Sequence, residues 1–305
     1  MTTRRIFFLV VFAFILCSVR LLNRDFYYDE IYTIVNFLFI PLGDIVHHYV
    51  NLNNHVLYSL INALYLRLIG VHDIDVILSH PWVLRLPQFV FTISTLALVY
   101  RFGMRFLNPR VAIFAVLLLS TTIPFYYYAC SIRGYGLSMT LFMGLLCCVW
   151  ERWYIPAGLI TAAFLYVMPS NAAFVVGVGL FCIRDKRLVI ALGTGVMLAA
   201  LLYSPILSGI LADPQTAVHN SHLRILTESI PETVNAFISY RWLLIPVVLL
   251  GLYRCRSRLF WGTICITATA LGIFLINGTY LWARVLFPLL PLWCIVTAEA
   301  IENTL

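Results

Sequence analysis

Charged residues are scarce in this chain of 305 residues, and their scarcity excludes an ordinary soluble domain. Asp, Glu, Lys and Arg together make up 11% of the sequence, whereas soluble domains carry about 25%. Hydrophobic residues make up 62%, and the mean hydropathy is +0.94. Apolar runs of about 15 to 20 residues recur along the chain, which indicates membrane-spanning helices rather than the short alternating segments of an outer-membrane barrel.

Lysine is almost absent, and the cysteines form no recognisable site. The net charge of +7 comes almost entirely from arginine, with Lys186 as the single lysine. Basic cytoplasmic loops explain this charge more simply than nucleic-acid binding, so we expect no nucleic-acid partner. The eight Cys lie mostly within or at the ends of apolar runs and include no CxxC pair. The sequence therefore predicts neither a disulfide framework nor a cysteine metal site.

No internal repeat, low-complexity tract or soluble domain interrupts the apolar runs, so we expect residues 1–305 to form a single membrane domain. The predicted fold class is all-α, with about ten transmembrane helices. The first run has no small-x-small cleavage site after it, so we interpret it as a retained span. The runs begin near Ile6, Val83, Val111, Tyr135, Tyr154, Asn171, Leu188, Trp242, Leu259 and Leu281.

The segment from His55 to Gly70 decides the topology. If it does not cross the membrane and the N-terminus is inside, twelve of the twenty basic residues lie on the inner side; if it crosses, ten of those twelve move outside. The positive-inside rule favours the first arrangement. We therefore expect this segment to be an amphipathic juxtamembrane helix within a first outer loop of about residues 23–82. A second outer loop covers about residues 205–240.

Two adjacent carboxylates, Asp29 and Glu30, lie among tyrosines in the first outer loop, directly after the first span. The simpler interpretation is a helix start, because acidic residues near a helix N-terminus complement its dipole. A carboxylate this close to a membrane is costly, however, and such a group can act as a general base on an acceptor hydroxyl or amine. Asp29 and Glu30 are therefore the predicted catalytic residues.

Three arginines, Arg85, Arg133 and Arg284, each lie near the outer end of a different predicted span. Each could snorkel to lipid phosphate, but three on one side favour a shared anion site, because the guanidinium fork suits phosphate oxygens. Tyr28 and Tyr135 lie beside these charged positions and are predicted to contact substrate, although aromatic residues at this depth also form interfacial belts.

Histidine is the remaining candidate for chemistry. Asn54-His55 opens the juxtamembrane segment, where Asn would cap a helix and His55 is a predicted substrate-binding residue. His47, His48 and His55 together with Asp29 would suit a divalent metal, but no tight ligand spacing supports one, so we expect no cofactor. In the second outer loop, residues 225–238 form a helical pattern with Glu228 and Glu232 at i, i+4, which predicts an exposed amphipathic helix or a lid.

The order of these segments resembles that of the GT-C glycosyltransferases, in particular the family that includes protein O-mannosyltransferases and the aminoarabinose transferases of lipid A. The resemblance rests on the Asp29-Glu30 pair after the first span and on Asn54-His55 opening an apolar helix that ends at Gly70. It also rests on Leu84-Arg85-Leu86-Pro87, on Arg133-Gly134-Tyr135 after an aromatic stretch, and on Arg284 before Phe287-Pro288. It covers about the first 150 residues and, more weakly, the last span.

The resemblance implies transfer of a sugar from a polyprenyl-phosphate donor, with inversion, to a lipid, glycan or protein acceptor on the outer or lumenal face. It implies a multi-pass protein of a plasma, inner or endoplasmic reticulum membrane. Asp29 matches the catalytic carboxylate, Glu30 its neighbour and Arg85 the arginine at the start of the second span. His55 falls where the family has His-Pro-Pro-Leu, although this sequence reads His-Val-Leu and lacks both prolines.

A membrane transporter or lipid flippase without transferase activity is the alternative function, and a non-catalytic membrane subunit is a third. A transporter would show polar residues near the bilayer midplane and broken helices. Pro124, Pro169 and Pro288 are the features of the sequence that favour it.

Overall fold

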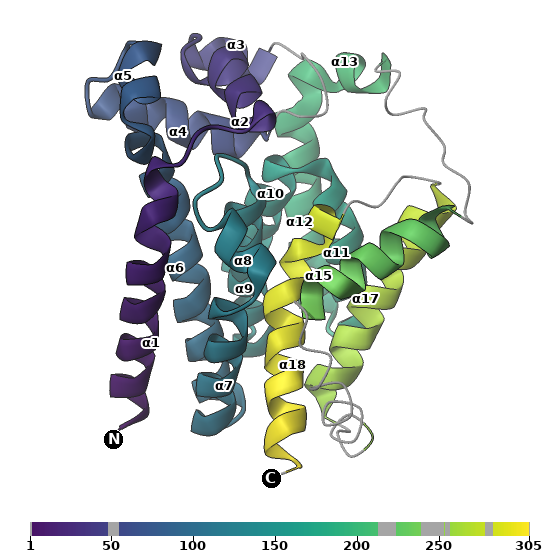
Figure 1. The fold of residues 1–305 in the computed structure, drawn as a ribbon. Coiled ribbons are helices and arrows are strands. Elements are labelled where there is room, and N and C mark those ends of the chain that lie inside the picture. The colour runs from purple at the N-terminus through teal and green to yellow at the C-terminus, as the bar shows by residue number, and fades with distance from the viewer. Residues whose placement is uncertain are drawn as a thin grey trace.

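The computed structural model describes residues 2–47, 55–212, 224–238, 253, 257–277 and 283–304. Throughout these ranges the regular elements are helices and no strand occurs, which confirms the predicted all-α class. Figure 1 shows long helices standing side by side, with both chain termini at the same end of the bundle. At the opposite end, short helices gather in a layer over the long ones. They are α2 (Tyr28–Thr33), α3 (Leu42–His47), α4 (Val56–Leu68) and α5 (Ile74–Ser79). We call this the loop end and the opposite one the basic end.

Five helical stretches within the described residues are long and apolar enough to cross a membrane, and they establish a multi-pass membrane protein. They are Thr3–Asn23, Pro81–Phe106, Lys186–Ala212, Arg258–Ile276 and Ala283–Glu302. The first consists of α1 (Thr3–Ser18) and η1 (Val19–Asn23), and the second is α6. The third begins with α12 (Lys186–Tyr203), the fourth is α17, and the last joins η8 (Ala283–Leu289) to α18 (Leu290–Glu302).

The other predicted spans within the described residues fall on shorter apolar helices. These are α7 (Pro109–Ser120), α9 (Tyr135–Glu151), α10 (Tyr154–Val167) and α11 (Ala172–Phe181). At about 1.5 Å per residue, such helices cover only part of the roughly 30 Å hydrocarbon core, so their crossing of the membrane stays a prediction. A short helix, α8 (Ile123–Tyr128), follows α7. The predicted run near Trp242 lies outside the described residues.

Polar caps start several helices at the basic end. The Asn108 side chain accepts from the backbone N–H groups of Arg110 and Val111, and Pro109 follows it at the first helical position of α7. Asp185 caps α12 by accepting from the N–H of Leu188. These caps satisfy backbone donors that a helix would otherwise leave unpaired at the membrane boundary.

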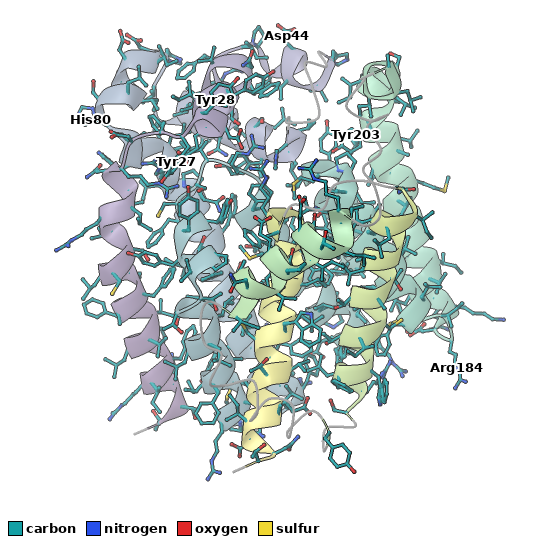
Figure 2. The ribbon with its side chains drawn as sticks, turned by 45° about the vertical axis from the view of Figure 1, so that its right-hand side comes forward. Tyr27, Tyr28, Asp44, His80, Arg184 and Tyr203 are labelled. Atoms are coloured by element: carbon teal, nitrogen blue, oxygen red, sulfur yellow. The ribbon has the colours of Figure 1, made fainter. Side chains whose placement is uncertain are left out.

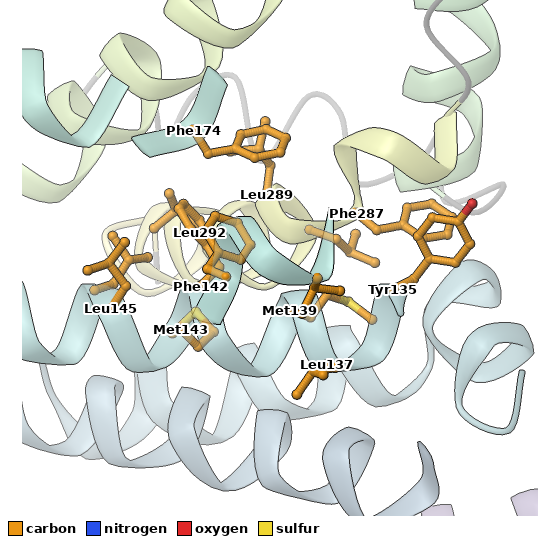
Figure 3. Close-up of a cluster of buried hydrophobic side chains, with 14 of the residues drawn as sticks. Tyr135, Leu137, Met139, Phe142, Met143, Leu145, Phe174, Phe287, Leu289 and Leu292 are labelled. Atoms are coloured by element: carbon orange, nitrogen blue, oxygen red, sulfur yellow. The ribbon is translucent and has the colours of Figure 1, made fainter. Parts of the chain in front are cut away.

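Helix α9 runs through the middle of the core. Figure 3 shows its residues Phe142 and Met143 packed among side chains of α11 and α18, represented by Phe174 and Leu292. The Phe142 ring also lies 5.6 Å from that of Phe164 in α10, so α9 contacts neighbours on several sides. Because α9 begins at Tyr135, this packing fixes the height of the loop that precedes it at the loop end.

Helix α4 is a separate helix in the layer at the loop end, where it packs on α3, α10 and η2 (Ile34–Leu38). Its polar residues do not form one exposed face: His55 and Asn62 are buried, while Arg67 donates to the Ile40 carbonyl at 2.8 Å. A small apolar cluster that includes Ile45, Tyr166 and Ile206 joins the layer to the C-terminal ends of α10 and α12. That α4 lies along the membrane surface stays a prediction.

Charge separates along the bundle as expected. Figure 2 shows Arg184 at the basic end and Tyr28, Asp44 and His80 at the loop end. In the part of the chain that the structure describes, basic residues lie at or beside the helix ends on the termini side of the bundle: Arg4, Arg5, Arg101, Arg105, Arg110, Arg152, Arg184, Lys186, Arg187 and Arg258. The positive-inside rule assigns this end to the cytoplasm, so the loop end is predicted to face outward.

Candidate active site

Helix α2 places both acidic residues in its first turn. The Glu30 carboxylate reaches back and accepts from the N–H of Tyr27, the residue that caps the helix, at 3.0 Å. The Glu30 carboxylate therefore caps the start of α2, which agrees with the simpler interpretation of the acidic pair as a helix start. Residues adjacent in a helix point about 100° apart, so Asp29 and Glu30 have different surroundings.

Glu30 is buried, with an exposed fraction of 2%, and every contact of its carboxylate is with a donor or a cation. Oε2 lies 3.1 Å from Arg85 Nη2, and Oε1 accepts from the backbone N–H of Ile132 at 2.8 Å. Arg24 lies 3.6 Å from Oε1. These contacts join α2 to α6 and to the loop between α8 and α9, so Glu30 holds three parts of the loop end together.

Arg85 is fully buried, with an exposed fraction of 0%, and its guanidinium is enclosed by the chain between η1 and α2. It donates to the carbonyls of Leu22 at 3.1 Å and Asp25 at 3.1 Å, and also to that of Arg24. Its guanidinium carbon lies 4.7 Å from the ring centre of Phe26. Arg85 thus fixes the non-helical chain that leads from the first span to α2.

Arg24 is a site residue that the sequence did not single out. Its guanidinium carbon lies against the rings of Tyr27 and Tyr127, at 4.8 and 4.7 Å from their centres. It also donates to Ser131 Oγ at 2.8 Å. The one signal in the sequence is its place five residues before Asp29, which does not indicate a contact with residues about 100 positions away.

Asp29 and Arg284 form the accessible part of the site. Asp29 Oδ2 lies 3.1 Å from Arg284 Nη1, and the side chains are 32% and 33% exposed. Arg284 also hydrogen-bonds with the hydroxyl of Tyr128. Segment η8, which carries Arg284, packs on α9, and the Phe287 ring lies 4.8 Å from that of Tyr128. A partly exposed carboxylate is therefore oriented by a partly exposed guanidinium beside an aromatic wall.

Arg133 lies beneath this pair and is 4% exposed. Its Nη1 lies 3.4 Å from the backbone carbonyl of Asp29 and 3.3 Å from Thr33 Oγ1. Arg133 therefore supports α2 from below, with its charge close to the position where Asp29 and Arg284 meet.

His55 and Tyr135 pack together behind Arg133. His55 Nδ1 accepts from the N–H of Gly134 at 3.1 Å, and the ring centres of His55 and Tyr135 are 5.3 Å apart. A side chain at position 134 would overlap His55, which explains the glycine. Burial lowers the pKa of His55 well below its usual range, and Arg133 and Arg284 lower it further, so the imidazole is neutral. Tyr28, by contrast, is 78% exposed on the first turn of α2.

The metal hypothesis gains no geometric support. His47 Nδ1 is 2.9 Å from the Gly43 carbonyl, while His55 Nδ1 faces Gly134. Within the described ranges no three His, Cys, Asp or Glu residues come close enough to share a metal ion. His48 and Asn54 lie outside the described residues.

The structure thus brings the eight predicted residues to the loop end around α2, but it divides them. Asp29, Arg284 and Tyr28 are at least partly exposed, whereas the other five are buried. Those five are Glu30, His55, Arg85, Arg133 and Tyr135. The predicted common phosphate site of three arginines is not an open surface in this structure, because two of the arginines are occupied by internal contacts.

The fold and the layer of short helices at the loop end define an all-α, multi-pass membrane protein. In particular, the chain is similar in structure to the ArnT crystallised from Cupriavidus metallidurans in the apo state, with a TM-score of 0.66 and 14% sequence identity. ArnT is the lipid A aminoarabinose transferase, so the resemblance found in the sequence is confirmed at the level of the fold.

The match covers 97% of this chain and 59% of the ArnT chain, so this chain spans less than two thirds of its neighbour's length. No protein-family profile matches the sequence, and no curated protein matches it significantly. At 14% identity, the shared architecture carries the fold but not the identity of substrates.

Proposed function

We propose that this chain is an integral-membrane glycosyltransferase that moves a sugar from a polyprenyl-phosphate-linked donor to an acceptor at the loop end. The observation that carries the proposal is the contrast within α2. Glu30 is buried and anchored, whereas the neighbouring Asp29 carboxylate is 32% exposed and oriented by Arg284. A fixed, accessible carboxylate beside a cation suits a reaction in which a proton is removed and an anion departs.

The chemistry is an inverting displacement at the anomeric carbon. The acceptor oxygen or nitrogen forms a bond to this carbon while the bond from the carbon to the phosphate oxygen breaks. The acceptor's proton passes to Asp29, and the electron pair of the broken bond leaves on the polyprenyl phosphate. Arg284 would stabilise the negative charge on the departing phosphate, since its guanidinium is the most exposed of the three predicted arginines.

The contacts support different roles for the three arginines. Arg284 is proposed to bind the donor phosphate directly. Arg133, 4% exposed and adjacent to the Asp29 backbone, would add positive potential beneath it. Arg85 is proposed to be a positioning residue, because its contacts are to Glu30 and to the backbone between η1 and α2.

Tyr28 and the pair of His55 and Tyr135 also take distinct proposed roles. Tyr28 is exposed beside Asp29 and would offer a surface on which an acceptor can stack. His55 and Tyr135 are buried and would shape the floor of the site by holding the Gly134 turn.

The distribution of buried charge favours a transferase over a transporter. Across the described residues, the buried Asp, Glu, His, Lys and Arg side chains are Glu30, His55, Arg85 and Arg133. All four lie at the loop end. Proton- or ion-coupled transport would require such groups along the path through the bundle.

The test is transfer by purified Asp29→Asn protein. Donor lipids that copurify with the wild-type chain are identified by mass spectrometry and supplied in labelled form with membrane-derived acceptors. Asp29→Asn keeps the size of the side chain but removes its basicity, so transfer should fall by about 10²–10⁴-fold, as for other general bases. Donor binding and the gel-filtration profile should be retained.

Asp44→Asn is the matched control, since Asp44 lies at the loop end in α3 and outside the site. Transfer by this variant should equal that of the wild type. Near-normal transfer by Asp29→Asn would refute the assignment of the base. Saturable solute exchange in liposomes by a protein that transfers no sugar would replace the transferase with a transporter.

A further inference from the structure

A cavity of about 810 Å³ opens at the basic end, at the opposite end of the bundle from Asp29. It lies where three parts of the chain meet: the α9–α10 connection, the α11–α12 connection and the start of α17. Five cationic side chains line it, accompanied by the single carboxylate of Asp185, so its lining carries a net of four positive charges. The cations are Arg152, Arg184, Lys186, Arg187 and Arg258.

These cations are not neutralised by acidic side chains in the part of the chain that the structure describes. The ion pairs formed there, within 4.0 Å, involve other arginines. Asp185 is engaged elsewhere: it caps α12 at the N–H of Leu188 and lies 3.4 Å from the Tyr154 hydroxyl. Clustered like charges repel one another, and a bound anion would offset this repulsion.

The floor of the cavity holds one of these cations in place. The rings of Trp150 and Phe181 stack with their centres 5.9 Å apart, and the Arg258 guanidinium lies 6.0 and 5.5 Å from the two ring centres. Arg152 lines the cavity from the C-cap of α9. Its φ of 59° is left-handed, at a helix C-cap where glycine is usual, so an arginine is kept at an unfavourable backbone position on the cavity wall.

Part of the cavity wall is apolar and continues onto the outer surface of the bundle. Ile183 lines the cavity and is 63% exposed, and Leu180 of α11, one turn earlier, is 49% exposed. Trp261, in the first turn of α17, is 57% exposed. A membrane protein presents such side chains to lipid, so an acyl chain can lie against them while its head group enters the basic cavity.

We infer that this cavity is a binding site for the phosphate head group of an anionic phospholipid in the leaflet at the basic end. Basic pockets between helix ends on the cytoplasmic side suit such head groups. A water-soluble phosphate compound has the same charge, but it would make no use of the apolar surface that Ile183 and Leu180 present outside the cavity. The site is independent of the proposed transfer reaction at the loop end.

The test is native mass spectrometry of the purified, delipidated full-length chain titrated with phosphatidylglycerol. Phosphatidylethanolamine serves as the zwitterionic comparison, and inorganic phosphate and glycerol 3-phosphate serve as soluble competitors. Phosphatidylglycerol should bind at least about tenfold more tightly than phosphatidylethanolamine, because each nearby basic residue contributes about 1 kcal/mol of attraction. Millimolar soluble phosphate should not displace it.

The double variant Arg184→Gln/Arg187→Gln should weaken phosphatidylglycerol binding by about tenfold or more. Arg4→Gln/Arg5→Gln removes the same charge at the same end but outside the cavity, and should change binding by less than about twofold. Arg258→Met keeps a side chain over Trp150 and Phe181 while removing the cation, and should also weaken binding. Equal loss in the Arg4/Arg5 control, or equal binding of the two lipids, would overturn the inference. Full displacement by glycerol 3-phosphate would replace the lipid with a soluble ligand.

Discussion

Glu30→Gln should destabilise the protein more than any single change at the exposed part of the site. Gln has the size of Glu but only one acceptor oxygen. Its amide NH₂ must face either the donors at the Oε2 position, Tyr27 N–H and Arg85, or those at Oε1, Ile132 N–H and Arg24. Either orientation sets donor against donor in a buried place and leaves the buried Arg85 charge without its anion.

Breaking a buried ion pair by removing one charge costs about 3–5 kcal/mol. That is a large part of the roughly 5–15 kcal/mol by which a folded protein is stabilised. For a chain of this size we expect the apparent unfolding midpoint in detergent to fall by about 5–10 °C. The assay heats purified protein in steps and measures the folded fraction by gel filtration.

Glu228→Gln is the matched control. Glu228 pairs with Arg224 at 2.9 Å, but both side chains are more than half exposed, at 53% and 55%. Exposed pairs contribute about 0–1 kcal/mol, so this variant should unfold within about 2 °C of the wild type. A double variant, Glu30→Gln/Arg85→Met, should lose less stability than the sum of the two single changes, because it leaves neither charge buried alone.

If Glu30→Gln unfolded together with Glu228→Gln and the wild type, Glu30 would not be an anchor of α2. The division between a buried anchor and an accessible base would then have to be abandoned. If the two Glu30 and Arg85 changes were simply additive, the ion pair would have no role beyond its separate backbone contacts.

Three further outcomes are expected. Arg284→Ala should reduce transfer at low donor concentration by about tenfold or more, with Lys restoring it only in part, since Lys lacks the planar fork; full transfer by the Ala variant would contradict phosphate binding. Because burial, Arg133 and Arg284 lower the pKa of His55, the unfolded chain binds its proton more readily, so the free energy of unfolding should decrease as the pH falls below about 6.5. His55→Asn should flatten that dependence in denaturation curves, and an unchanged slope would refute it. In a Cys-free background, a Cys at Ser79 should react with an impermeant thiol reagent in intact cells and one at Asn108 should not; the reverse pattern would invert the topology.

The helices were predictable because their signals are local. Asn108 followed by Pro109 marks the start of α7, and Asp185 marks that of α12. The apolar runs place the helices between such signals. The basic residues predict which end of each helix faces the cytoplasm. The distribution of charge also predicts that the segment of α4 is not one of the spans. If His55–Gly70 crossed the membrane, most basic residues would move to the outer side.

Which site residues are buried anchors and which are accessible was not predictable from the sequence, because burial depends on contacts between distant segments. Asp29 and Glu30 are equivalent carboxylates in the sequence. Which of them is buried depends on where Arg85 and the Ile132 N–H lie, 55 and 102 positions away. Arg85 and Arg284 likewise both lie near span ends. Only the chain from Leu21 to Asp25, where η1 ends and the irregular link to α2 begins, separates a buried positioning role from an accessible one, because its carbonyls enclose Arg85.

The geometry of the site depends on this irregular chain because α2 is too short to hold itself. Even with η2 (Ile34–Leu38), which continues it, α2 forms a helical stretch shorter than the roughly 12–15 residues that an isolated helix needs, so tertiary contacts must fix it. Glu30 supplies them on one side, and Arg133 supports the backbone of Asp29 from below. Asp29 is then free of these anchoring contacts and faces Arg284. Precise anchoring matters because a general base must be placed to within a fraction of an ångström. It follows that changes to the anchors should lower stability and transfer together. Changes to Asp29 itself should lower transfer alone, and the two kinds of residue can be told apart by measuring both properties in the same preparations.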